Sequence, residues 1–226
     1  MDSCRLCRLL TVSRVSTSRR RSVQSRGDIR EGELLQIAEQ LLRDGRFWDA
    51  SISDIVSAAG ISRPTFYFYF ASKEALLERL IETRLDELVD RHFRHTQRHH
   101  ETAAAEVLET MHMVSQMWVD HGAVLSAAAE LAGSVPSVFD LIAGVIDGAA
   151  TQRAQLLVEA GTTPEVADLK AATATAKALL WMAERCFYVL WRETGSAEEF
   201  HALADRLYAI WVRTAGLEAG PPLPAA

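Results

Sequence analysis

The sequence has no run of 18 or more apolar residues, although 49% of its 226 residues are hydrophobic. Because a bilayer-spanning helix needs about 20 apolar residues in succession, we expect no membrane span. Cysteine is scarce as well, with three residues in the chain. Three are too few for a disulfide scaffold and indicate a reducing compartment, so we expect a cytoplasmic protein.

Proline is also scarce, and so is the alternation of apolar and polar residues that is typical of β-strands. Three of the six prolines lie after residue 220, which leaves long stretches free to be helical. Val, Ile and Thr never alternate with polar residues over a sustained stretch, so the sequence predicts an all-α fold. It also lacks Ser-His-Asp, Cys-His, P-loop and Gly-rich nucleotide motifs, so we predict no enzyme activity and no cofactor.

Positive charge is unevenly distributed within a net charge of −6. Residues 1–98 hold 17 Lys and Arg against 14 Asp and Glu, whereas residues 99–226 hold 7 against 16. The first 30 residues are the extreme case, with eight arginines and two acids. This asymmetry predicts that a polyanion binds at the N-terminal end.

Residues 1–27 are predicted to be a basic, disordered arm that lies along nucleic acid. A transit-type targeting segment or an extension without function remain alternatives. The pair Cys4 and Cys7 within this arm supplies two ligands where a structural zinc site takes four, so we expect no metal there. A second disordered segment is predicted at the C-terminus, over 217–226.

Two short helices joined by a tight turn are predicted within a first domain over 28–75. A capping box at Ser51 opens the first helix, and Ala59-Gly60 ends it with a small residue and a turn-forming glycine. Ser62 caps the second helix, which tolerates Pro64 in its first turn. This arrangement is typical of a helix-turn-helix. The flanking helices are expected from Asp28 to Gly45 and over about 73–97.

Residues 52–76, ISDIVSAAGISRPTFYFYFASKEAL, closely resemble the DNA-binding signature of TetR-type transcriptional regulators, most of all the EthR branch. The strong part of the resemblance covers roughly 34–85, and beyond it the similarity is faint. The resemblance implies an N-terminal helix-turn-helix DNA-binding domain and a C-terminal helical domain over 76–216. The second domain is expected to bind an effector and to form a homodimer through its last two helices.

The resemblance also places the start of the second short helix in the major groove of double-stranded operator DNA. Arg63 can then bond a guanine edge, and Pro64 or Thr65 can touch a thymine methyl. Hydroxyl and ammonium groups nearby suit phosphates, whereas the side chain of Phe68 is left without an assignment. The predicted DNA-binding residues are Ser53, Ser62, Arg63, Pro64, Thr65, Tyr67, Tyr69 and Lys73.

Further helices are predicted over 103–120, 122–133, 136–160, 164–193 and 197–215. Four of them carry apolar faces that either line one adaptable pocket or fill an ordinary core. Alanine-rich patches beside Trp and Met favour the pocket. The predicted ligand-binding residues are Val107, Met111, Val114, Trp118, Phe139, Ala143, Ile146, Ala150, Leu180, Ala183, Phe187 and Trp211.

The proposed faces carry no Arg or Lys. A strongly anionic effector would therefore lose its hydration without gaining a partner. We expect an uncharged, apolar small molecule that releases a repressor from its operator.

Two other function classes remain as alternatives. A helical-bundle metal-dependent enzyme is suggested by Glu109-x-x-His112 and Glu198-x-x-His201, which have the spacing of di-iron carboxylate sites. Both pairs are predicted to lie opposite the apolar faces, in solvent, so we expect no metal site. Histidines at 92, 95, 99 and 100 are read as a solvated helix end, with a metal or pH switch as the alternative. The other class is a small-molecule binder without DNA activity.

Overall fold

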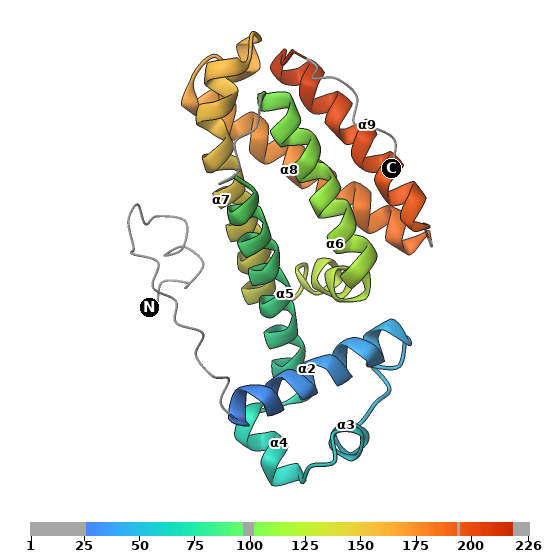
Figure 1. The fold of residues 1–226 in the computed structure, drawn as a ribbon. Coiled ribbons are helices and arrows are strands. Elements are labelled where there is room, and N and C mark those ends of the chain that lie inside the picture. The colour runs from blue at the N-terminus through green and yellow to red at the C-terminus, as the bar shows by residue number, and fades with distance from the viewer. Residues whose placement is uncertain (1–25, 97–101, 194, 219–226) are drawn as a thin grey trace.

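The structure is a computed structural model that describes residues 26–96, 102–193 and 195–218 (Figure 1). These residues form helices and no strand, which confirms the predicted all-α fold. The basic arm before Arg26, the pair Cys4 and Cys7, and the tail after 218 lie outside the described residues, as do His99 and His100. The helices are α2 (Arg26–Arg43), α3 (Ile52–Ala58), α4 (Arg63–Tyr69), α5 (Lys73–Thr96), α6 (Ala103–Leu131), α7 (Pro136–Ala160), the 3-10 helix η1 (Pro164–Val166), α8 (Leu169–Arg192) and α9 (Ala197–Ala215).

The long helix α5 joins a small N-terminal domain to a larger helical bundle. In Figure 1, α2, α3 and α4 lie together at the bottom, and α5 rises from them among the helices of the bundle. Within the bundle α7 packs on α8 and α6 packs on α9, while α5 lies against both α6 and α7. Because α2 also packs on α5 and α6, the two parts share an interface.

The small domain is built by local capping and a shared apolar core. Ser51 accepts a hydrogen bond from the Asp54 backbone and completes the capping box of α3, as predicted. Ser62 caps α4 by accepting from the backbone N–H of Thr65. Ile55 of α3 and Phe66 of α4 are fully buried in the apolar core, where α3 packs on both α2 and α4.

One predicted helix boundary in the bundle coincides with a kink, and another is wrong. The segments predicted as separate helices over 103–120 and 122–133 are the two arms of α6, which is kinked at His121 (φ −132°, ψ 21°). The helix predicted over 164–193 is divided into η1 and α8, because the Asp168 carboxylate accepts from the Ala171 N–H and starts a new helix.

Gly122, directly after the kink, lets α8 approach α6 closely. A Cβ at Gly122 would lie 2.2 Å from the ring of Trp191, far inside van der Waals contact. In contrast, Gly144 of α7 has no atom within 4 Å of the place that its Cβ would occupy. The two glycines therefore have opposite structural roles within helices.

We expect Gly122→Ala to destabilise the fold by about 1–3 kcal/mol, because the rigid indole must shift to admit the methyl group. Gly144→Ala is the matched control and should stabilise the fold by up to about 1 kcal/mol through helix propensity. Urea unfolding followed by circular dichroism measures both. Equal effects of the two substitutions would contradict the close approach of Trp191.

Candidate nucleic-acid interface and effector pocket

The helix α4 presents an aromatic and basic face to solvent. Phe66 is fully buried on the core side, whereas Tyr67 is 53% exposed and Phe68 is 81% exposed. At 100° per residue, Pro64 and Phe68 lie nearly opposite Phe66 on the helix. Phe68, which the sequence left without an assignment, thus lies at the centre of the outward face.

Hydrogen bonds hold the first turn of α4 in place. The Arg63 Nη2 donates to Ser53 Oγ of α3 at 2.7 Å, so two predicted DNA-binding residues meet across the helix-turn-helix. Ser62 Oγ and Thr65 Oγ1 lie 2.8 Å apart and also bond each other. Arg63 and Ser53 remain exposed, whereas Thr65 and Tyr69 are half-buried.

Lys73, for which we predicted a phosphate contact, has a structural role within the chain. Its ammonium donates to three backbone carbonyls in the loop between α2 and α3, those of Phe47 (3.1 Å), Trp48 (2.8 Å) and Ala50 (3.0 Å). An ammonium has three donors, so all of them are used within the chain. Lys73 therefore fixes this loop to the start of α5.

A buried carboxylate joins the small domain to the bundle. Glu39 of α2 accepts hydrogen bonds from Arg84 of α5, with Nε at 3.1 Å, and pairs with His121 Nδ1 at the kink of α6, at 2.6 Å. Arg43 lies 3.5 Å from the same carboxylate. Burial alone would raise the pKa of Glu39, but the bonds from His121 and Arg84 outweigh it and hold this pKa below its usual value.

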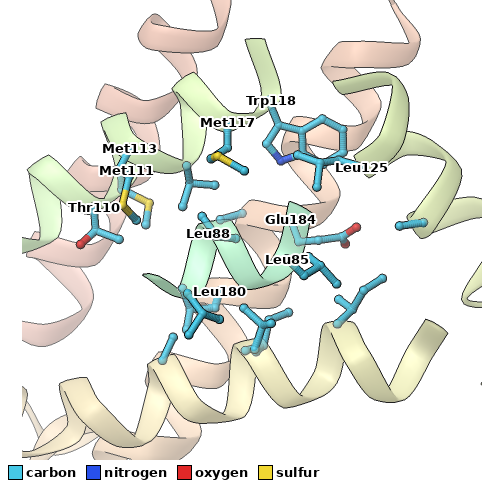
Figure 2. A pocket seen from close by; sticks show the side chains of 18 of the residues that line it. Leu85, Leu88, Thr110, Met111, Met113, Met117, Trp118, Leu125, Leu180 and Glu184 are labelled. Carbon is cyan, nitrogen blue, oxygen red and sulfur yellow. The ribbon is translucent and has the colours of Figure 1, made fainter. Parts of the chain in front are cut away.

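A cavity of about 330 Å³ lies in the bundle between α5, α6, α7 and α8 (Figure 2). Its size falls within the range of small-molecule sites, about 300–1,000 Å³. Methionine, leucine and tryptophan side chains make up much of the wall. Half of the predicted ligand-binding residues line it: Met111, Val114, Trp118, Ile146, Leu180 and Ala183.

The other predicted ligand-binding residues lie elsewhere. Phe187 is fully buried and stacks between Trp118 and Phe200, and Trp211 is also fully buried. Val107 and Ala150 are likewise buried outside the cavity wall. Ala143 is half-buried, and Phe139 is 47% exposed and stacks on Trp181. The residues that line the cavity include none from α9, because its apolar face packs into the core.

Charged residues in the cavity wall contradict the expectation that no Arg or Lys is present. Arg153 is fully buried and donates to Thr110 Oγ1 at 2.7 Å and to the Ala149 carbonyl at 3.2 Å. Burial lowers its pKa to about 10. Asp90 and Glu184 also line the wall, and burial raises the pKa of Glu184.

The helical spacing of the sequence could have placed Arg153 and Glu184 on the predicted ligand-binding faces. Arg153 continues the helical spacing of Ile146 and Ala150 by one further turn, and Glu184 lies four residues after Leu180. The contribution of Leu85 and Leu88 from α5 was missed, because that helix was assigned no ligand-binding face.

The histidines of the two Glu-x-x-His pairs meet between α6 and α9 and are less solvated than predicted. His112 of α6 and His201 of α9 stack with ring centroids 5.8 Å apart, and each is half-buried instead of fully solvated. His112 bonds Asp205 at 2.9 Å, and His201 bonds Ser115 at 3.1 Å. Within residues 26–96, 102–193 and 195–218, no group of three or more His, Cys, Asp or Glu is placed to hold a metal ion.

Within the same residues, no single helix has the length and apolar character to span a membrane. The pair α6 and α7 meets this criterion when joined, with a bend of 116° between them.

Residues 34–80 match the family model for bacterial regulatory proteins of the tetR family. Over 75 residues the chain is 49% identical to the HTH-type transcriptional regulator EthR of Mycolicibacterium smegmatis, covering 33% of this chain and 35% of that protein. The EthR protein of Mycobacterium tuberculosis is 52% identical over 63 residues, 28% of this chain and 29% of that protein. These matches confirm the resemblance found in the sequence.

The chain thus matches about a third of the length of these curated relatives. The crystal structure of a tetR-family transcriptional regulator from Streptomyces coelicolor resembles the chain more widely. It has a TM-score of 0.63 and 24% identity, and the match covers 84% of this chain and 83% of that one. At this level of identity the likeness concerns the fold.

The Glu39 carboxylate leads to a prediction about pH. Because its pKa is lower in the folded chain than the ordinary value of 4.5, its stabilising effect is complete above about pH 4.5 and is lost as the pH falls through the folded pKa. Glu39→Gln should lower the free energy of unfolding by about 3 kcal/mol at pH 7 and reduce its dependence on pH below 5. Urea titrations at several pH values measure both effects.

The matched control is Glu87→Gln. Glu87 pairs with the same Arg84 at 2.7 Å but is 41% exposed, so its replacement should cost less than about 1 kcal/mol. An equal loss of stability for Glu39→Gln and Glu87→Gln would contradict the role of Glu39 as the buried carboxylate that joins α2 to α5 and α6.

Proposed function

We propose that this chain, whose N-terminal domain is that of a TetR-family transcriptional regulator resembling EthR, is a repressor that a small molecule releases from its operator. It acts in the cytoplasm as a homodimer. The observation that carries the proposal is the position of α5. This helix starts at the helix-turn-helix, contacts α2, and contributes Leu85 and Leu88 to the cavity.

The exposed face of α4 supplies the base-reading surface. Arg63 is held by Ser53 and keeps further guanidinium donors for a guanine edge in the major groove. Pro64 and Phe68 offer apolar contacts to thymine methyl groups, and the Tyr67 hydroxyl suits a phosphate. Phe68 thus joins the predicted DNA-binding residues, and Lys73 supports them by fixing the loop beside α3.

A homodimer explains how so short a recognition helix achieves useful affinity. One helix contacts a few base pairs, and pairing two of them raises the local concentration of the second on the operator. The resemblance assigns the dimer interface to the last two helices. In support, Val189 of α8 is 42% exposed and borders a shallow groove between α8 and α9.

Coupling between the cavity and the DNA-binding domain passes through Glu39 in this proposal. Leu85 lines the cavity and follows Arg84, which holds Glu39. Trp118 also lines the cavity, and His121, three residues later, holds the same carboxylate. A ligand that shifts α5 or the kink of α6 therefore changes the position of α2 on the bundle. It releases DNA if it binds the shifted arrangement more tightly.

We expect the purified protein to select a roughly palindromic operator from random DNA. Arg63→Ala should then weaken operator binding about 5- to 150-fold, the equivalent of 1–3 kcal/mol, and weaken binding to random DNA much less. Fluorescence anisotropy measures both affinities.

The control is Arg192→Ala, which removes an exposed arginine of α8 that pairs with Glu130 of α6 at 2.8 Å and does not line the groove between α8 and α9. It should leave both DNA affinities unchanged. If no sequence is selected, the DNA-binding proposal fails and a small-molecule binder without DNA activity is the better interpretation.

The release mechanism predicts reciprocal coupling. With octan-1-ol as an apolar probe of the cavity, operator DNA should weaken ligand binding by the same factor by which ligand weakens operator binding, about 5- to 150-fold. His121→Ala should reduce this factor while changing each separate affinity little. Calorimetric titrations with and without operator give the factor.

His112→Ala is the matched control, because it removes a half-buried histidine of the same helix that faces α9 instead of α2. Its coupling factor should equal that of the unaltered protein. Equal octanol affinities with and without operator would rule out the release mechanism, even if the cavity binds octanol.

A further inference from the structure

Glu184 of α8 is a carboxylate in a mostly apolar cavity wall. Figure 2 shows it in the cavity wall that Trp118, Leu125 and Leu85 also line. Its side chain is 17% exposed. The Oε2 atom is buried and receives no hydrogen bond from the residues that the structure describes. A buried carboxylate oxygen in this state has lost its hydration without a compensating donor.

The nearest cation gives Glu184 little compensation. Arg185 Nε lies 3.8 Å from Glu184 Oε2, beyond hydrogen-bond distance, and its side chain is 57% exposed. Its guanidinium also lies over the ring of Tyr188, 4.9 Å from the centroid. An ion pair with so exposed a partner contributes little, and burial accordingly raises the pKa of Glu184.

Two further charged residues line the cavity, and neither is a main cause of the raised pKa of Glu184. Asp90 of α5 is a second carboxylate in the wall, and Arg153 is the cation there. The guanidinium of Arg153 donates to Thr110 Oγ1. In Figure 2, Thr110 lies at one end of the cavity and Glu184 towards the other, with Leu88 and Met117 between them.

We infer that the effector of this cavity is an amphiphilic cation, with an apolar body among the Leu and Met side chains and a protonated amine that donates to Glu184 Oε2. The inference rests on the proposed function, which makes the cavity the effector site. An aliphatic ammonium stays charged at neutral pH, as lysine does, and provides both the missing donor and the opposite charge. The indole of Trp118, which lines the same cavity, offers a further favourable surface for a cation. The inferred effector thus differs from the uncharged molecule expected from the sequence by its positive head group.

Three eight-carbon probes test the head group while the apolar body stays the same. Octylammonium, octan-1-ol and octanoate are titrated by calorimetry at pH 7 into the full-length protein without DNA. Octylammonium should bind at least about ten-fold more tightly than octan-1-ol, which is the size of a charge-assisted hydrogen bond. Octanoate should bind most weakly. Octan-1-ol or octanoate binding as tightly as octylammonium would overturn the inference.

Glu184→Gln removes the charge at nearly constant volume and should abolish the preference for octylammonium while leaving octan-1-ol affinity unchanged. Asp90→Asn is the matched control, because it removes the other carboxylate of the wall, at an exposed position. This control should keep the preference. Retention of the preference in Glu184→Gln, or its loss in Asp90→Asn alone, would assign the cation elsewhere and overturn the inference.

If Glu184→Gln does not fold, as judged by circular dichroism, Glu184→Met provides the same test with an apolar side chain of similar size. The binding preference is measured without DNA, so it stands apart from the proposed release of the operator. Octylammonium that binds through Glu184 but leaves operator affinity unchanged would refute operator release alone. Octylammonium that releases the operator equally from Glu184→Gln and from the unaltered protein would refute the cation site alone.

Discussion

The buried carboxylate of Glu39 holds together three helices that otherwise belong to different parts of the fold. Arg84 reaches it from α5 and His121 reaches it from the kink of α6, while Glu39 itself lies on α2. A charge so well enclosed requires its partners to stay in place. The orientation of the small domain on the bundle therefore depends on one carboxylate, and its partners Arg84 and His121 each lie within three residues of a side chain in the cavity wall.

The small domain could be predicted well from the sequence because its structure is set by local rules. The caps at Ser51 and Ser62 and the turn at Gly60 involve residues at most three or four apart, and the structure has each of them in place. Lys73 shows where local rules end. Its carbonyl partners lie more than 20 residues earlier in the chain, so no spacing rule could distinguish this role from a phosphate contact.

The cavity could be predicted only in part, because an apolar helix face does not reveal what covers it. Met111 and Phe187 occupy equivalent positions on such faces, yet Met111 lines the cavity and Phe187 fills the core against Phe200. The sequence predicts the break at residue 121, but the direction in which it turns the second half of α6 depends on packing, and the contribution of α5 depends on how the two domains meet. Both are tertiary effects. Arg153 and Glu184 have the helical spacing of the predicted faces, but a search restricted to apolar residues omits them because they are charged.

The three carbonyls around the Lys73 ammonium separate its role as a hydrogen-bond donor from its role as a charge. A lysine that neutralises a phosphate displaces counterions condensed on the DNA, and each such contact steepens the fall of affinity with ionic strength. Carbonyl oxygens are neutral, so the three hydrogen bonds of Lys73 occupy its donors but leave its positive charge in place. Lys73 therefore still adds its charge to the positive field of the small domain, whereas a direct hydrogen bond to a phosphate would have to replace one of its carbonyl bonds.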